Sequence, residues 1–240
     1  MIEIQNVTKE FPGKTAVKDL TLEVENGKIF GFLGPNGAGK STTIKMLTGI
    51  LPVEEGRIAI NGFDISKHPL KAKQLIGYVP DRSDVFLRLK GIEYLNFIAD
   101  VYQVPTKVRK EKIEYLTKSF GIYEDLNDHI LTYSHGMRQK IVVSGVLLHD
   151  PEVWILDEPL TGLDPKSSYT LKEMMREHAN KGNIVFFSTH VLEVVEQLCD
   201  EVAIINNGHI EFRGNMTDMK QQFKDDDNLE KLFLELTQDE

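Results

Sequence analysis

The chain has 240 residues, and its 28 basic and 37 acidic side chains give a formal net charge of −9 at pH 7. This charge argues against a nucleic-acid partner, because such proteins usually carry a basic surface stripe. The single cysteine, Cys199, excludes an internal disulfide, and the sequence shows no bilayer-spanning apolar run and no secretory signal pattern. We therefore expect a cytoplasmic location.

The first third of the chain is predicted to be rich in strands. Apolar and polar residues alternate over 2–7 and 20–24, which is typical of strands with one buried face. A turn is expected at Phe11-Pro12-Gly13-Lys14 and a further short strand over 57–60. Together these elements predict an antiparallel β layer at the N-terminal end.

A glycine-rich loop follows a predicted buried strand over 28–33 and precedes a predicted helix over 43–47. The loop fits the phosphate-binding pattern G-x-x-x-x-G-K-[ST] with Gly34, Pro35, Asn36, Gly37, Ala38, Gly39, Lys40, Ser41 and Thr42. Its backbone N–H groups and the helix N-terminus can hold phosphate, while the lysine reaches the β- and γ-phosphates and the serine binds Mg²⁺. A chance glycine-rich turn is the alternative, and the matching flanks disfavour it.

The middle of the chain is predicted to be a helical insertion in a nucleotide-binding core. A strand over 76–80 precedes it, and helical spacing begins at about residue 90, with later helices expected over 107–120 and 141–148. We place this helical subdomain at about residues 85–148.

Beyond the insertion, strands and helices alternate. Strands are expected over 153–157 and 183–187, a helix over 167–180, and a hairpin over 202–212. This order predicts an α/β fold with a P-loop NTPase core and a mostly parallel sheet. Residues 227–240 are predicted to form an acidic C-terminal helix, which begins with a capping box and has one apolar face. We expect the 240 residues to form a single domain.

Two further segments carry candidate site residues. Asp157 and Glu158 end a buried strand, where one carboxylate can hold Mg²⁺ and the next can orient or deprotonate an attacking water. Ser134 opens a helix with Gly136 close behind, which makes a second anion site possible. The simpler interpretations are a solvated loop start for the acid pair and an ordinary helix cap for the serine.

The four motifs in this order resemble the ATP-binding subunit of ABC transporters, and the resemblance covers about residues 2–214. Tyr133-Ser134-His135-Gly136-Met137 keeps the serine and the second glycine of the family signature Leu-Ser-Gly-Gly-Gln. Ser134 precedes Asp157 by 23 positions, and His190 follows Asp157 by 33, as is typical of the family.

The resemblance implies the remaining roles. Phe11 matches the aromatic residue that stacks on adenine, and Leu163-Asp164 matches the loop that communicates across a dimer. Glu158, His190 and Lys40 are implied as catalytic residues, with ATP as the nucleotide. Ser134 and Gly136 would contact the γ-phosphate bound to the other subunit.

Mg²⁺ would be held by Ser41, Asp157 and Asp81. Asp81 departs from the family, which usually has glutamine there, and its carboxylate adds negative charge near the γ-phosphate. A milder departure is His135, where the family has glycine.

The implied partners are a transmembrane permease and a second ATPase subunit, either a copy of this chain or a related one. The segments 133–140 and 161–165 resemble those of the bacterial exporter branch. This resemblance implies an exporter subunit held peripherally at the inner face of the cell membrane. Family members that act on ribosomes or chromosomes are an alternative, disfavoured by the single phosphate loop, the lack of a long heptad run and the negative charge. A P-loop GTPase or kinase would leave the signature segment unexplained.

Overall fold

The structure is a computed structural model that describes residues 1–84, 86–215 and 217–218. The predicted C-terminal helix over 227–240 lies outside the described residues. No helix among the described residues combines the length and the apolar character needed to cross a bilayer.

The predicted N-terminal β layer is confirmed as a four-stranded antiparallel sheet. Its strands are β1 (Ile2–Phe11), β2 (Lys14–Val24), β4 (Glu55–Ile60) and β5 (Phe63–Asp64), in the order β2-β1-β4-β5. Ile4 lies opposite Leu22 on β2 and Ile58 on β4, and all three are buried. The alternation seen in the sequence therefore reflects one face packed on the core.

The central sheet holds six strands in the order β10-β9-β3-β8-β7-β6. They are β3 (Ile29–Leu33), β6 (Ile76–Val79), β7 (Val153–Asp157), β8 (Ile184–Thr189), β9 (Glu201–Asn206) and β10 (His209–Gly214). The strands from β9 to β6 are parallel, and only β10 pairs antiparallel. Every residue of β3, β7 and β8 is buried, as expected for strands covered on both faces. The predicted fold class is confirmed.

Four helices join the strands of the core: α1 (Lys40–Leu47), α2 (Pro69–Leu75), α6 (Pro165–Asn180) and α7 (Leu192–Leu198). Helix α6 begins two residues before its predicted start, because Asp164 caps it by accepting a hydrogen bond from the Ser167 N–H at 2.9 Å. Helices α2 and α7 were not predicted from the sequence.

The segment between β6 and β7 is helical, and we call its residues 91–147 the helical part. It contains α3 (Gly91–Val101), α4 (Thr106–Ser119), the short 3₁₀ helices η1 (Glu124–Asn127) and η2 (Ile130–Thr132), and α5 (His135–Leu147). One apolar cluster continues from α3 and α4 through α5 to β7, β8 and α6. The helical part is thus packed onto the central sheet through a shared core.

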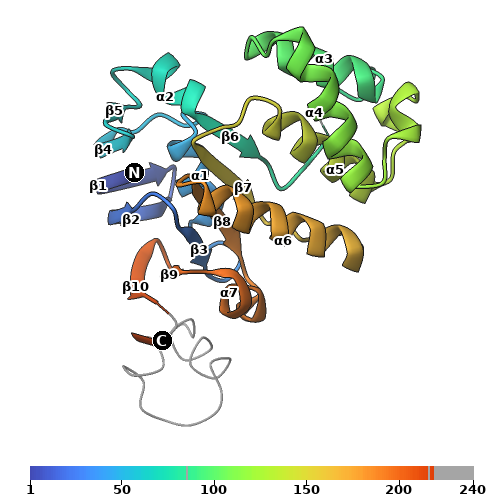
Figure 1. The fold of residues 1–240 in the computed structure, drawn as a ribbon. Helices are drawn as coiled ribbons and strands as arrows, with labels where there is room; N and C mark the ends of the chain where they lie inside the picture. Colours follow the sequence, from blue (N-terminus) through green and yellow to red (C-terminus); the bar gives the residue numbers. More distant parts are fainter. Residues whose placement is uncertain (85, 216, 219–240) are drawn as a thin grey trace.

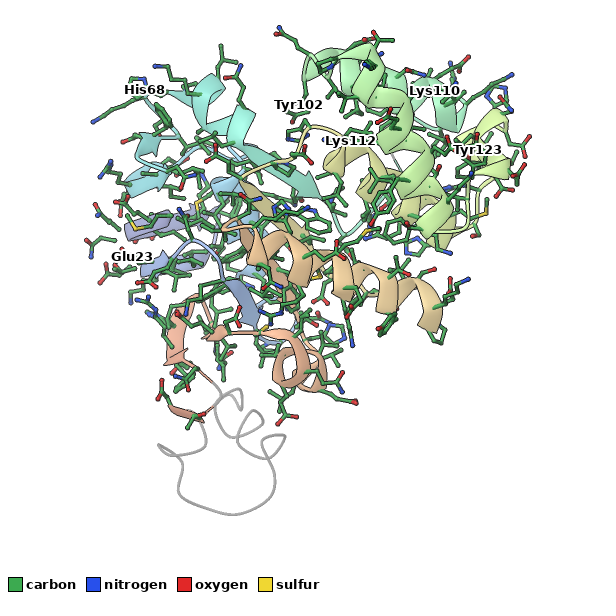
Figure 2. The ribbon with its side chains drawn as sticks, viewed as in Figure 1. Glu23, His68, Tyr102, Lys110, Lys112 and Tyr123 are labelled. Atoms are coloured by element: carbon green, nitrogen blue, oxygen red, sulfur yellow. The ribbon has the colours of Figure 1, made fainter. Side chains whose placement is uncertain are left out.

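The arrangement is visible in the figures. Figure 1 shows the N-terminal sheet on one side of the molecule and α3 and α4 on the other, with α1 between them. In Figure 2, Lys110, Lys112 and Tyr123 mark the helical part, whereas Glu23 and His68 mark the opposite side.

Candidate functional site

The edge formed by the carboxyl ends of β3, β8 and β7 brings the main candidate residues together. These strands are parallel neighbours, so the segments that follow them meet at the same edge of the sheet. The loop 34–39 follows β3, Glu158 follows β7, and His190 follows β8. Residues far apart in sequence therefore form one site.

The backbone of the phosphate loop requires glycine at two positions. A Cβ on Gly34 would lie 2.3 Å from the carbonyl oxygen of Ile205, and one on Gly39 would lie 2.5 Å from that of Ala16. Gly39 also has φ +111°, a conformation that L side chains rarely adopt. The loop is thus pressed against β2 and β9 and then turns directly into α1.

We expect Gly39→Ala to destabilise the protein more than Gly62→Ala. Gly62 also has positive φ, but its Cβ would meet nothing within 4 Å, so its replacement costs only about 1–2 kcal/mol of backbone strain. Gly39→Ala should cost about 1–3 kcal/mol more, because the new methyl group overlaps the Ala16 carbonyl. Urea unfolding of both variants measures the difference, and equal losses would contradict this account of the loop.

Lys40, the first residue of α1, points its amino group back into the loop. The residue is only 6% exposed, and its Nζ donates to the carbonyl oxygens of Gly34 at 2.7 Å and Pro35 at 3.1 Å. Nζ also lies 3.7 Å from Glu158 Oε1. Burial lowers the pKa of Lys40, although Glu158 and then Asp157 oppose that shift. The site thus holds a buried cation next to two carboxylates.

Asp157 is buried at the end of β7, between two serine hydroxyl groups. Ser188 Oγ donates to Asp157 Oδ1 at 2.5 Å, and the nearby Ser41 hydroxyl, like Ser188, acts to lower the pKa of this carboxyl group. Burial, followed by the charges of Asp81 and Glu158, raises the pKa of Asp157 despite these two hydroxyl groups. The structure therefore places the predicted metal-binding residues Ser41, Asp157 and Asp81 in one neighbourhood.

Glu158 adopts a left-handed conformation with φ +48°. Such a conformation costs a non-glycine residue about 1–3 kcal/mol, and it persists only where the surroundings enforce it. The Glu158 N–H donates to Ser188 Oγ at 3.0 Å. His190 Nδ1 lies 3.1 Å from each carboxylate oxygen of Glu158. The glutamate is thus held between the buried lysine and the more exposed histidine.

The oxygen groups at this edge suit Mg²⁺. Among the described residues, no group of three or more His, Cys, Asp or Glu side chains is arranged to hold a metal ion by itself. Mg²⁺ is usually bound through one or two carboxylates together with substrate phosphates and water, so a hydroxyl and a carboxylate beside a phosphate loop meet its requirements. The residues present fit the ion.

The signature residues lie on the helical part. Ser134 caps α5, and its hydroxyl accepts a hydrogen bond from the Met137 N–H at 3.2 Å, as predicted. A Cβ on Gly136 would lie 3.0 Å from the Gly162 carbonyl oxygen, so α5 packs near the loop after Glu158. The described contacts of Ser134 and Gly136 are to α5 itself and to this loop, rather than to residues 34–42.

Phe11 lies at the end of β1 and is 41% exposed, with Lys9 Nζ 5.6 Å from its ring centroid. Phe11 is therefore an exposed residue and not part of the core. Its stacking on adenine stays a prediction.

Sequence reasoning missed one residue at the centre of the site. Ser188 is fully buried at the end of β8, where its hydroxyl joins the Asp157 carboxylate to the Glu158 N–H. The only signal in the sequence was a hydroxyl residue next to a run of buried apolar residues, which is also common at ordinary strand ends.

Comparison with known proteins places the chain in a family. The profile described as "ABC transporter" matches residues 17–161. The Linearmycin resistance ATP-binding protein LnrL of Bacillus subtilis (strain 168) is 37% identical over 91% of this chain and 70% of its own length. The ABC transporter ATP-binding protein NatA of the same organism is 34% identical over 95% and 94%, respectively.

Solved structures agree with this placement. A structure described as the ATP binding subunit of an ABC transporter has a TM-score of 0.94 and 30% identity, covering 99% of this chain and 100% of its own. The ATP-binding cassette MJ0796 was solved as a dimer in a post-hydrolysis state bound to ADP and Pi. Its TM-score is 0.81 at 20% identity, and the match covers 90% of this chain and 99% of the cassette. The two proteins therefore share the fold. The chain therefore belongs to the ABC transporter family, in which it is an ATP-binding subunit and an ATPase.

Proposed function

We propose that this subunit hydrolyses ATP as a head-to-tail dimer and thereby powers export by a permease that is a separate chain. The observation that carries the proposal is the cluster of Lys40, Glu158 and His190 at the mouth of the phosphate loop. Lys40 Nζ lies 3.7 Å from Glu158, and His190 lies 3.1 Å from the same carboxylate. Lys40, which would bind phosphate, thus lies beside Glu158, the proposed base, and His190, which would orient that base.

The proposed chemistry is phosphoryl transfer to water, which depends mainly on positioning and charge stabilisation. The N–H groups of the loop 34–42 and the Lys40 ammonium hold the phosphates. Glu158 accepts the proton of the attacking water, and His190 fixes the carboxylate and contacts the γ-phosphate. Mg²⁺, when bound by Ser41, Asp157 and Asp81, neutralises charge on the phosphates.

The position of the signature helix supports the proposed dimer. Ser134 and Gly136 stand at the exposed start of α5, a helix N-terminus suited to phosphate. Because their described contacts lie within α5 and with Gly162, we propose that they complete the phosphate site of a second subunit. The MJ0796 cassette, which shares this fold, was solved as a dimer.

The permease partner is supported by relatives. A structural neighbour, cbiO1 of Clostridium perfringens, is described as part of the ABC transporter complex cbiONQ, and it is 25% identical with a TM-score of 0.78, covering 93% of this chain and 91% of its own. The LnrL relative is named for resistance to linearmycin, and export of a compound from the cell would provide such resistance. We therefore propose a cytoplasmic subunit held at the inner face of the membrane by its permease, without a nucleic-acid partner.

Purification of the tagged chain from its own cells in mild detergent, followed by mass spectrometry, tests this proposal. We expect a polytopic membrane protein in stoichiometric amount, together with either this chain alone or a second ATPase subunit. Ribosomal proteins or DNA-bound partners in place of a membrane protein would overturn the transporter function and favour the non-transport branch of the family. Cargo accumulation in vesicles made from those cells then gives the direction of transport.

A further inference from the structure

A buried side chain in α5 joins the two segments that carry Asp81 and Glu158. Gln139 is 1% exposed, and its Oε1 accepts a hydrogen bond from Ser83 Oγ, which is 2% exposed. Its Nε2 donates to the carbonyl oxygen of Pro159 in a long hydrogen bond of 3.5 Å. Ser83 follows Asp81 by two residues, and Pro159 follows Glu158 directly. One amide group thus contacts both segments.

Burial makes this contact consequential. A buried amide that loses its partner costs the full desolvation of that group, so Gln139 and its neighbours are held together. Two other pairs attach α5 to the same segments: Arg138 Nη1 lies 2.6 Å from Asp84 Oδ1, and Lys140 Nζ lies 2.8 Å from Asp164 Oδ2. Both pairs have an exposed carboxylate, and such ion pairs contribute little. Of these contacts between α5 and the two segments, the hydrogen bonds of Gln139 are the buried ones.

The contact also acts on a strained backbone. Glu158 has φ +48°, and its N–H is held by Ser188 Oγ on one side. On the other side, the Pro159 carbonyl is held by Gln139. The backbone is therefore restrained by a side chain before and after Glu158. Without the Gln139 restraint, the backbone can relax and move the carboxylate away from Lys40 and His190.

We propose that Gln139 is a positioning residue for ATP hydrolysis. Its amide fixes the direction of the Glu158 carboxylate and couples it to the Asp81 segment and to the start of α5. A shift of α5 is thereby transmitted to Glu158 through one side chain. The inference rests on the proposed role of Glu158 as the base, and it assigns to Gln139 a role distinct from ATP binding, because its described contacts are outside the phosphate loop.

The test compares Gln139→Met and Ser83→Ala in the full chain, with steady-state MgATP hydrolysis and direct ATP binding as readouts. Methionine keeps the length of glutamine but forms neither hydrogen bond. We expect kcat to fall about 10–100-fold in Gln139→Met, the usual effect of losing a positioning partner, with KM and ATP affinity nearly unchanged. Ser83→Ala should lower kcat by a smaller factor, and the double variant should match Gln139→Met, because the pair acts as a unit.

Ser144→Ala is the matched control. Ser144 is also fully buried in α5, but the described hydrogen bond of its hydroxyl stays within the helix, to the Lys140 carbonyl oxygen at 2.8 Å. We expect wild-type kcat from this variant. A general loosening of α5 would lower kcat in Ser144→Ala as well, and that result would overturn the inference, as would a rise in KM equal to the fall in kcat.

A Glu158→Gln variant assayed in parallel separates this inference from the proposed function. If Glu158→Gln loses hydrolysis while Gln139→Met and Ser83→Ala keep wild-type kcat, the positioning role is wrong and the proposed function stands. If Glu158→Gln hydrolyses ATP normally, Glu158 is not the base, and the inference loses the role on which it rests. Should Gln139→Met fail to fold, Ser83→Ala decides: a reduced kcat at unchanged KM supports the inference, and wild-type kcat overturns it.

Discussion

Glu158→Gln is expected to bind ATP with wild-type affinity but to hydrolyse it about 10²–10⁴-fold more slowly, the contribution typical of a positioned general base. The amide retains the size of the carboxylate but cannot accept the proton of the attacking water. Its neighbours Lys40 and His190 remain in place, so the bound nucleotide persists and the ATP-bound dimer accumulates. Phosphate release in a single turnover measures hydrolysis, a binding assay measures ATP affinity, and light scattering measures accumulation of the dimer.

The control for this prediction is Glu173→Gln, which makes the same chemical change at an exposed position of α6. We expect that variant to hydrolyse ATP at the wild-type rate. Unchanged turnover in Glu158→Gln would remove the glutamate from the mechanism. A parallel loss of ATP affinity would instead assign it to binding.

Lys40→Ala is expected to abolish ATP binding at ordinary nucleotide concentrations. Hydrogen bonds to charged groups contribute about 1.5–3 kcal/mol each, so losing contacts to two phosphates lowers the affinity by on the order of 10²–10⁴-fold. The fold should remain intact, because alanine favours the helix and because burial already disfavours the charged lysine, as its lowered pKa shows. Equilibrium dialysis with ATP and circular dichroism measure the two effects.

Lys45→Ala provides the comparison, since Lys45 is an exposed lysine of the same helix α1. Its removal should leave ATP binding within experimental error of wild type. Normal affinity in Lys40→Ala would refute the assignment of the phosphate loop, and unfolding of that variant would show that Lys40 is required for the fold.

Much of the fold could be predicted because its pattern is local. The strands β3, β7 and β8 are built on short, mostly apolar runs. The alternation over residues 2–4 of β1 and 20–24 of β2 shows which face is buried, although register shifts interrupt it elsewhere in the pair. Helices α2 and α7 escaped prediction because each has seven residues. A helix of only two turns is too short to show a clear helical period in the sequence, so packing against the sheet decides the conformation of such a segment.

The candidate site also contains some residues that could be predicted from the sequence and others that could not. Lys40, Asp157, Glu158 and His190 could be found because each belongs to a motif with a fixed residue type next to a strand end. Ser188 and Gln139 could not, since a single buried polar residue leaves no repeating pattern. Each of these two residues acts through a partner that is distant in sequence. Ser188 donates a hydrogen bond to Asp157, 31 positions away, and Gln139 donates one to Pro159, 20 positions away.

Complementation between two inactive variants tests the central claim, that the signature helix of one subunit completes the ATP site of another. Lys40→Ala chains cannot bind ATP but carry an intact Ser134, whereas Ser134→Arg chains bind ATP but cannot complete a partner's site. Each variant alone should be inactive, and mixing them should restore ATP hydrolysis, because the mixed dimer contains one complete site. Background activity in the mixture, with both variants folded and ATP bound to Ser134→Arg, would contradict the account.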